Sequence, residues 1–564
     1  MPALLARNQW PRWLPVLAIG GLSLTSSLIC LRNDYSYDDI AIIFKSERAH
    51  SLASAWKVFA LPYWSKPFEG LYRPLTTLSL AAQWVTGGGR PWVVHATSVV
   101  LYLACCLALY ALARQLLPQA AAWVAAALFA VDPVHVEAIA LGVNQAEIVV
   151  ALLLISATSL YLRARAAGPL TPAGGAALVG LYTVACFTKE HAIVFPGLLI
   201  AAEMTVVVDP RPLRHRLREL RPLILVLLLA ATLFMVARTL VLQDVVGTFT
   251  AEGLRDANLT QRALTMLAVV PRWTRLLLWP SHLQVDYTPR EIDMATGWGA
   301  DQTLGALLIL LVVAVGLVAY RRKPVVTFGL LWVMIGLFPV SNVLVPTGIV
   351  MAERTLFLPS AGLLLALGTA VPWVRARIAE ARPAIRLAAI GTFAVLLASA
   401  SWFSAYRLTV YRNQFMLFYH MVEDAPLSYR AHWSYGDLLF NIGMNQAGEA
   451  HYRAAIALFP DGAIVYQGLA DRYRLAGKCK PAMDLYQQAL ALRPAADDIR
   501  ASLVACLLIE GRYQDARFQA RLGRAGGANL ENFSTFIRVA DSALAAGAKP
   551  GTVSVMVTDT TGGR

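Results

Sequence analysis

Long apolar runs are the feature that most limits what this chain can fold into. A helix that crosses a membrane needs about 20 mostly apolar residues. Of the 564 residues 57% are hydrophobic and only 15% are charged, whereas an average soluble domain carries about 25% charged residues. The sequence therefore predicts a polytopic membrane protein with about eleven transmembrane helices. The predicted spans lie at residues 13–31, 93–116, 120–140, 144–163, 172–188, 191–208, 222–243, 303–320, 324–340, 355–374 and 385–406.

The basic residues predict the orientation of these spans, because Lys and Arg collect in cytoplasmic loops. A twelfth run, 263–280, carries Arg272 and Arg275 at its middle, where each costs roughly 2.5–3.5 kcal/mol in a bilayer. If this run stays at the outer interface and the N-terminus is cytoplasmic, all the Arg-rich loops are cytoplasmic. The net charge of +14 is then mainly a topology signal, and no nucleic-acid motif competes with it. The Arg-rich loops are 163–165, 211–221, 321–323 and 375–386.

The N-terminus and the cysteines add little to this picture. Arg7 and Arg12 flank the first apolar run, and no small-residue cleavage site follows it, which predicts an uncleaved signal anchor. The six cysteines form no CxxC motif and no zinc spacing. Neither a zinc site nor a disulfide framework is therefore predicted.

After Tyr406 the composition changes and a 34-residue period begins. Gly443, Gly477 and Gly511 recur at this spacing, as do Pro, Tyr and Ala residues. A 34-residue period with small residues at the helix contacts is typical of tetratricopeptide repeats, which form an α-solenoid of paired helices. We expect a transmembrane domain at 1–406 with its first outer loop at 32–92, repeats at 407–525, and a capping helix with a flexible tail at 526–564. The three repeat units are placed at about 429–462, 463–496 and 497–525, and the capping helix near 529–547.

Polar residues gather on the outer side of the predicted topology, at or near membrane depth. Ionisable groups in such places are costly and indicate a functional site. Each group also has a structural explanation, such as a tight hairpin, a satisfied interfacial histidine, an ion pair or a solvated loop. Their placement on one face favours function over these alternatives. The residues are Asp38, Asp39, Arg73, His135, Glu137, Glu147, Lys189, Glu190, His282, Asp286, Tyr287, Glu353 and Arg354.

These residue types suit group transfer from a lipid phosphate to an acceptor hydroxyl. One of the adjacent carboxyls Asp38 and Asp39 can act as general base while the other orients it or its partner. Lys189 and Arg354 supply positive charge for a phosphate, and a guanidinium grips two oxygens at once. The carboxylates and histidine leave a divalent metal open, although no ligand spacing requires one.

The sequence resembles the transmembrane and tetratricopeptide repeat-containing (TMTC-like) protein O-mannosyltransferase family of the GT-C glycosyltransferase superfamily. The likeness covers nearly the whole chain in order, including the repeats. It departs from the family pattern at Asp132-Pro133-Val134-His135, where His-Pro-x-His is typical, and at 144–147, where Gly-Arg-Ala-Glu is typical. The matching stretches are Tyr37-Asp38-Asp39, Tyr72-Arg73-Pro74-Leu75-Thr76, residues 128–138, Ala146-Glu147, Lys189-Glu190, Trp279-Pro280-Ser281-His282-Leu283 with Asp286-Tyr287, Ser341-Asn342, Ala352-Glu353-Arg354 and Leu358-Pro359-Ser360.

The resemblance implies an inverting enzyme that transfers a mannose-like sugar from a polyprenyl-phosphate donor to Ser/Thr hydroxyls of proteins. In the family the first outer loop carries the catalytic acid, which implies Asp38 as base and Asp39 as its support. Arg354, Lys189 and Arg73 are then expected to bind the donor phosphate. The substrate-binding candidates are His135, Glu137, Glu147, Glu190, His282, Asp286, Tyr287 and Glu353.

The compact, Arg-rich form is typical of bacterial members. It predicts a multi-pass protein of a bacterial inner membrane with a cytoplasmic N-terminus and periplasmic repeats that present a protein acceptor. Two other functions remain open: a non-catalytic repeat scaffold for an envelope complex, and a transporter of lipid-linked sugars.

Overall fold

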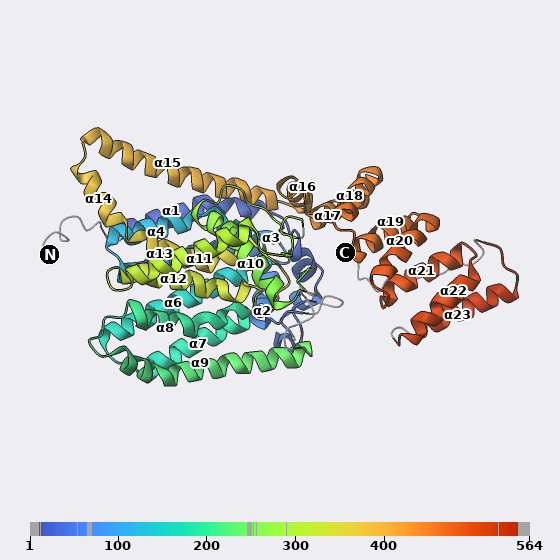
Figure 1. Ribbon diagram of the computed structural model, residues 1–564, viewed down its shortest axis with the longest axis horizontal. Helices are drawn as coiled ribbons and strands as arrows, with labels where there is room; N and C mark the ends of the chain where they lie inside the picture. Colours follow the sequence, from blue (N-terminus) through green and yellow to red (C-terminus); the bar gives the residue numbers. More distant parts are fainter. Residues whose placement is uncertain are drawn as a thin grey trace. The chain divides into compact units, whose positions relative to one another are not determined.

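A computed structural model gives the architecture in two units. The first comprises residues up to Tyr287 and Ile292–His420, and the second comprises Thr288–Glu291 and the residues from Met421 onward. Every regular element among the described residues is helical (Figure 1). Arg7, Arg12 and the expected tail from residue 551 lie outside the described ranges. The structure describes residues 11, 13–53, 55–64, 70–244, 251, 253–254, 257–288, 290–527 and 530–550.

The first unit contains fifteen long or short α-helices and most of a sixteenth, α16 (Gln414–Asp424), which crosses the boundary between the units. Several of them begin with proline, which is favoured there because the first helical N–H needs no partner. The others are α1 (Trp13–Ser27), α2 (Pro74–Gly87), α3 (Pro91–Leu116), α4 (Gln119–Ala130), α5 (Val136–Ala140), α6 (Gln145–Ala167), α7 (Pro172–Thr188), α8 (Phe195–Thr205), α9 (Leu213–Leu242), α10 (Leu259–Leu278), α11 (Ala300–Ala319), α12 (Pro324–Leu337), α13 (Phe357–Gly368), α14 (Val371–Glu380) and α15 (Pro383–Leu408).

Seven helical segments among the described residues are long and apolar enough to cross a membrane. An eighth candidate is the bent pair Gln119–Ala130 and Pro133–Ala140, whose two parts meet at 48°. The predicted spans at 172–188 and 324–340 are found with these bounds as apolar helical segments, but both are too short to count among the seven, and the predicted span at 191–208 contains only the shorter helix α8. Helix α10 is not among these candidates, which agrees with the prediction that Arg272 and Arg275 keep the run 263–280 from crossing the membrane. The seven segments are Trp13–Arg32, Pro91–Leu116, Gly142–Ala167, Leu213–Leu242, Ala300–Ala319, Glu353–Glu380 and Pro383–Tyr411.

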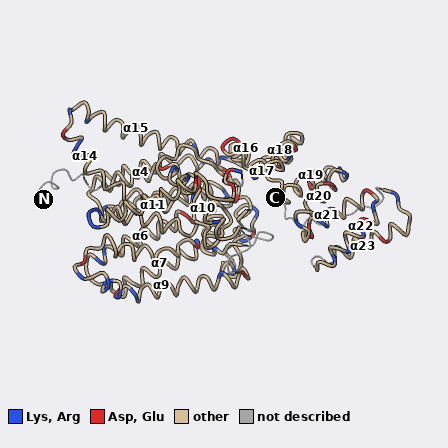
Figure 2. Tube along the Cα trace, viewed as in Figure 1, with Lys and Arg blue, Asp and Glu red and all other residues tan. Residues whose placement is uncertain are grey.

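Charged residues are concentrated at the ends of the helices of the first unit. Lys and Arg gather at the left-hand ends of these helices in Figure 2. There, Arg165 near the end of α6 contacts Glu203 of α8 at 2.6 Å and Asp209 at 2.9 Å, and Arg216 of α9 contacts Glu203 at 3.2 Å. The Tyr161 hydroxyl also donates to Glu203 at 2.5 Å. This end lies away from the start of α6, where Glu147 is found.

The second unit is the predicted repeat array. Its helices begin at residues 429, 463 and 497 and again at 445, 479 and 513, so each pair repeats every 34 residues. Gly443, Gly477 and Gly511 all have positive φ between the helices of a pair, a conformation that glycine adopts without steric cost. The helices are α17 (Tyr429–Asn441), α18 (Asn445–Leu458), α19 (Ala463–Leu475), α20 (Cys479–Leu492), α21 (Asp497–Ile509), α22 (Tyr513–Ala525) and α23 (Leu530–Ala545).

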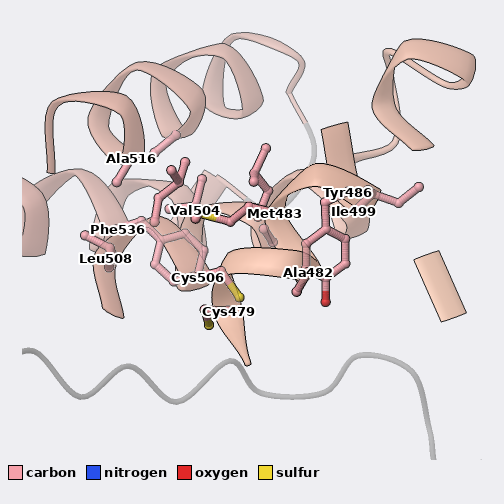
Figure 3. Packing of buried hydrophobic residues seen from close by; sticks show 14 of the residues in the cluster. Cys479, Ala482, Met483, Tyr486, Ile499, Val504, Cys506, Leu508, Ala516 and Phe536 are labelled. Atoms are coloured by element: carbon pink, nitrogen blue, oxygen red, sulfur yellow. The ribbon is translucent and has the colours of Figure 1, made fainter. Parts of the chain in front are cut away.

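The last two repeats and α23 share one hydrophobic core. Tyr486, Val504 and Phe536 come from three different helices and pack in the same cluster (Figure 3). Cys479 and Cys506 are buried in this cluster as free thiols. Helix α23 thus covers the apolar face that the last repeat would otherwise expose, which is the role of a capping helix in a repeat array.

Candidate active site

The loop that follows the first helical segment places the two predicted catalytic carboxyls differently. Asp38 is half-buried, whereas Asp39 is fully buried. Tyr37, immediately before them, has a φ of 52°, which is uncommon for a bulky residue and indicates local strain. Strain of this kind costs about 1–3 kcal/mol and persists only where the surrounding structure enforces it.

The buried carboxylate of Asp39 is held by backbone amides at the start of the α6 segment. Gly142 N–H donates to Asp39 Oδ2 at 2.8 Å, and Val143 N–H donates to Oδ1 at 2.9 Å. A Cβ atom on Gly142 would lie 2.4 Å from Val94 and 2.9 Å from Ile43. Only glycine therefore lets the loop and the helix approach closely enough for both hydrogen bonds.

Burial raises the pKa of Asp39 to about 7. The hydrogen bonds from Val143 and Gly142 act in the opposite direction, and the charge of Asp38 adds to the rise. Desolvation thus outweighs the two amide donors. Near neutral pH the Asp39 carboxyl is therefore partly protonated.

The segment that precedes Asp38 is fastened to the end of α15 and the turn after it. Asn33 Nδ2 donates to the Leu408 carbonyl at 3.0 Å, and the Asp34 N–H donates to the Arg412 carbonyl at 2.8 Å. These bonds link the first loop to a segment more than 370 residues later in the chain. They fix the backbone from which Asp38 projects.

A bidentate ion pair joins the first loop to the turn after α7. Arg73 donates from Nε to Glu190 Oε2 at 3.0 Å and from Nη2 to Oε1 at 2.5 Å. Burial opposes the ionisation of Glu190, but the Arg73 guanidinium overrides it and holds the pKa of Glu190 below its usual value. The Thr76 hydroxyl of α2 also donates to the Thr188 carbonyl at 2.7 Å. The ion pair and this hydrogen bond together join the start of α2 to the end of α7 and the turn that follows it.

A second pair connects that same turn to α6. Lys189 Nζ contacts Glu147 Oε1, and His191 Nε2 lies 3.4 Å from Glu147 Oε2. Burial lowers the pKa of Lys189, while the charge of Glu147 raises it. Lys189 also lies within the electrostatic range of Arg73, Glu190 and Arg354, so the two ion pairs belong to one cluster.

A third pair places Arg354 beside the catalytic candidates. The Arg354 guanidinium contacts Glu137 Oε1, and its backbone N–H donates to Glu137 Oε2 at 2.9 Å. Asp38 and Glu147 also act electrostatically on Arg354. The charge of the predicted base therefore acts on the predicted phosphate-binding arginine.

Glu353 organises the loop that follows α10. Its Oε1 accepts the Gln284 backbone N–H at 2.5 Å and the Tyr287 hydroxyl at 2.8 Å. Burial, followed by the charge of Glu353, raises the pKa of Tyr287 well above its usual value. Tyr287 therefore remains a hydrogen-bond donor. Through these two hydrogen bonds, Glu353 holds the loop at Gln284 and Tyr287 in place.

Three further candidates differ in their burial and in their hydrogen bonds. His135 is fully buried, with Nδ1 3.1 Å from the Tyr102 hydroxyl and Nε2 2.9 Å from the Ser360 hydroxyl, which favours a structural role. His282 is exposed, with Nδ1 2.9 Å from Ser281 Oγ. Asp286 is buried.

The described part of the chain contains no group of three or more His, Cys, Asp or Glu side chains arranged to hold a metal ion. The carboxylates that could serve as ligands are instead used by cations and amides: Glu137 by Arg354, Glu147 by Lys189, and Asp39 by Gly142 and Val143. The divalent metal that the sequence left open therefore gains no ligand set from these residues.

Sequence reasoning missed the backbone partners of this site. Nothing in the sequence pattern around Gly142 and Val143 indicated that their amides face Asp39.

The sequence departs from the family pattern at Asn144 and Gln145, and both side chains form hydrogen bonds with other residues of the chain. Asn144 donates to the Glu137 carbonyl at 3.1 Å, and Gln145 exchanges hydrogen bonds with Gln83 at 2.9 and 3.1 Å.

Comparisons with known proteins confirm the predicted family resemblance. The family model described as dolichyl-phosphate-mannose-protein mannosyltransferase matches residues 76–239. The Drosophila melanogaster protein O-mannosyl-transferase Tmtc3 is 24% identical and covers 82% of this chain and 57% of its own length. The Mus musculus protein O-mannosyl-transferase TMTC3 is 25% identical, and the alignment covers 83% of this chain and 59% of the relative. The Caenorhabditis elegans protein O-mannosyl-transferase F38B6.6 is 24% identical, and the alignment covers 80% of this chain and 64% of the relative.

The chain thus spans about three fifths of the length of these curated relatives. Their alignments cover more than the family model does, since each includes about four fifths of this chain. Among solved structures, the crystal structure of the APC/C hetero-tetramer Cut9-Hcn1 aligns with 83% of this chain and 89% of that chain, at 13% identity and a TM-score of 0.24. A score that low carries no argument about the fold.

Proposed function

We propose that this protein is an inverting membrane glycosyltransferase that moves a mannose-like sugar from a polyprenyl phosphate to Ser/Thr hydroxyls of a protein acceptor. The observation that carries the proposal is the setting of Asp38. Its carboxyl is half-buried, follows a strained Tyr37, precedes the buried Asp39 in the sequence and acts electrostatically on the cation Arg354. The family resemblance supplies the substrate classes.

In this reaction Asp38 acts as general base. It takes the proton from the acceptor hydroxyl as the hydroxyl oxygen bonds to the anomeric carbon of the sugar. The bond between that carbon and the phosphate oxygen breaks, and its electron pair stays on the polyprenyl phosphate. Asp39 acts as a positioning residue, since its two amide hydrogen bonds hold the backbone that carries Asp38.

Three cations are assigned to the donor phosphate: Arg354, Lys189 and Arg73. Each already has a carboxylate partner, but an arginine has five N–H donors and an ammonium has three. Charge on the leaving phosphate develops as the bond breaks, and cations held in place beforehand stabilise it without reorganising. The carboxylate partners thus orient the cations before the donor arrives.

The repeats are assigned to the protein acceptor, because such arrays present extended binding surfaces. We place the candidate active site and the repeats on the outer side of a bacterial inner membrane, with a cytoplasmic N-terminus. The positive-inside rule supports this orientation, since α6 runs from Glu147 at the site to the basic end at Arg165.

Transfer by the purified full-length protein tests the proposal. A panel of polyprenyl-phosphate sugars is incubated with peptide or protein acceptors, and product is detected by mass spectrometry. We expect transfer with one or a few sugars and its loss in Asp38→Asn, with the variant still folded in membranes. Undiminished transfer by Asp38→Asn would remove this residue from the mechanism, and no transfer from any donor by the wild type would refute the function.

One observation bears on the alternative of a lipid-linked sugar transporter, which would use polar sites at both ends of its helices. Glu203 is buried at the end of the unit away from Glu147. Its oxygens are already taken by Arg165, Arg216 and Tyr161. This network joins three helices, and the use of both Glu203 oxygens within it favours a structural role over a second substrate site.

A further inference from the structure

Tyr63 lies in the first outer loop, between the candidate residues Asp39 and Arg73 in the sequence. Its side chain is 6% exposed, and its backbone N–H donates to the Leu71 carbonyl at 2.6 Å. The centre of the Arg73 guanidinium lies 5.5 Å from the centre of the Tyr63 ring. The ring of Trp64 meets it edge-on at 6.5 Å. The Tyr63 ring is thus held from two sides.

The hydroxyl of this buried tyrosine has no hydrogen-bond partner among the residues that the structure describes. The nearby Tyr72 hydroxyl, by contrast, donates to the Phe59 carbonyl at 2.9 Å. A buried polar group without a partner costs about 1–3 kcal/mol, and such groups are rare in native proteins. The unused donor of Tyr63 therefore calls for a partner from outside the chain.

The charges around the Tyr63 phenol show what kind of partner fits. Arg73, Asp39, Asp38 and Glu190 all act on it, and burial raises the pKa of Tyr63 well above its usual value. The phenol is therefore a neutral donor. Three of these four neighbours are carboxylates, and the cation among them already forms a bidentate pair with Glu190. With the donor phosphate assigned to the Arg73 guanidinium itself, the neutral phenol in this carboxylate-rich setting suits a neutral hydroxyl of the same donor, which can accept from Tyr63.

We propose that the Tyr63 hydroxyl donates a hydrogen bond to a hydroxyl oxygen of the sugar that is being transferred. This inference rests on the proposed function and adds a residue that contacts the substrate. The acceptor supplies a single reacting hydroxyl, whose proton goes to Asp38. The sugar carries several others, and each can accept from a phenol while donating to a carboxylate. Tyr63 would thus distinguish sugars by the position of one hydroxyl.

The test compares wild-type protein with Tyr63→Phe, using the polyprenyl-phosphate donor found active and its monodeoxy analogues. We expect Tyr63→Phe to raise the KM for the donor about tenfold, the size expected for one hydrogen bond of about 1.4 kcal/mol. The KM for the acceptor should stay unchanged. One monodeoxy donor should be used equally well by both proteins, because the bond is already absent. Tyr72→Phe is the matched control, since its hydroxyl bonds only to backbone.

Several results would overturn the inference. One is a Tyr63→Phe protein whose KM for the donor equals that of the wild type. Another is a substitution that changes only the KM for the acceptor. The third is a Tyr63→Phe protein that loses activity equally, relative to the wild type, with every monodeoxy donor. Thermal unfolding without substrate gives an independent check: Tyr63→Phe should unfold at or above the wild-type temperature, because it removes an unpartnered buried hydroxyl, whereas Tyr72→Phe should unfold earlier. A Tyr63→Phe protein that fails to fold would show that the hydroxyl has a partner within the chain. Failure of the wild type to transfer any sugar would instead refute the proposed function.

Discussion

Replacing Asp39 by asparagine separates the stability of the candidate site from its activity. The carboxyl is fully buried and accepts two backbone N–H groups, from Gly142 and Val143. Asparagine offers one oxygen, so one of these amides would face the NH₂ group. Leaving a buried donor without a partner costs about 1–3 kcal/mol at any pH.

The pH dependence of the wild type acts against this cost. Because the pKa of Asp39 is raised from its usual 3.8 to about 7, the folded protein holds the proton more tightly than the unfolded chain does. The stability from that proton is fully present below pH 4 and is lost as the pH rises through 7. At 1.36 kcal/mol per pH unit the loss is on the order of 4 kcal/mol. Asparagine does not titrate and therefore does not suffer this loss.

We therefore expect Asp39→Asn to be less stable than the wild type at pH 4 and equal or more stable above pH 7. Thermal unfolding of both proteins in detergent between pH 4 and pH 8 measures the difference. Sugar transfer should fall in Asp39→Asn throughout this range, because the backbone beneath Asp38 loses one of its two anchors. Asp34→Asn, in the exposed part of the same loop, is the control for removing a carboxylate from this segment and should retain sugar transfer. A stability gap between Asp39→Asn and the wild type that stays constant or widens as the pH rises would refute the reasoning.

Two further substitutions test the supports of the site. Gly142→Ala should lower the free energy of unfolding by about 1–3 kcal/mol, because the added Cβ would lie 2.4 Å from Val94. Thermal unfolding measures this loss, with Gly21→Ala as the control because there is open space around Gly21. Equal unfolding midpoints for the two variants would contradict the close approach at Gly142. Glu190→Gln should cost about 1–2 kcal/mol, since it leaves the Arg73 guanidinium unpaired but Glu190 is 36% exposed and partly screened. Its effect should shrink as the pH falls below about 4, because the lowered pKa of Glu190 gives stability only while it is ionised; an unchanged effect at low pH would exclude the ion pair as the cause.

The repeat array could be predicted almost to the residue, whereas the candidate site could be predicted only by composition. The glycine spacing of 34 alone located the three helix pairs, because each repeat packs mainly on its neighbours and its turn needs a positive φ. The site depends on contacts between distant segments. Glu137 and Arg354 meet across 217 positions of sequence, and no local pattern encodes such a meeting. In the sequence, Tyr63 stands among other aromatic residues, Trp56, Phe59 and Trp64, and nothing distinguishes it from them.

The positions at which two of the apolar helices stop or bend point to the same conclusion. Helix α7 ends at Thr188, immediately before Lys189 and Glu190, and the bend between α4 and α5 falls at Asp132-Pro133. A helix uses its backbone polar groups internally, whereas an irregular segment must satisfy them with other protein groups when water is excluded. Such interruptions persist only where protein surrounds them, and here they free amides such as those of Gly142 and Val143 to hold Asp39. In this chain, helices that stop short of a full span therefore mark the positions where the polar side chains of the candidate site converge.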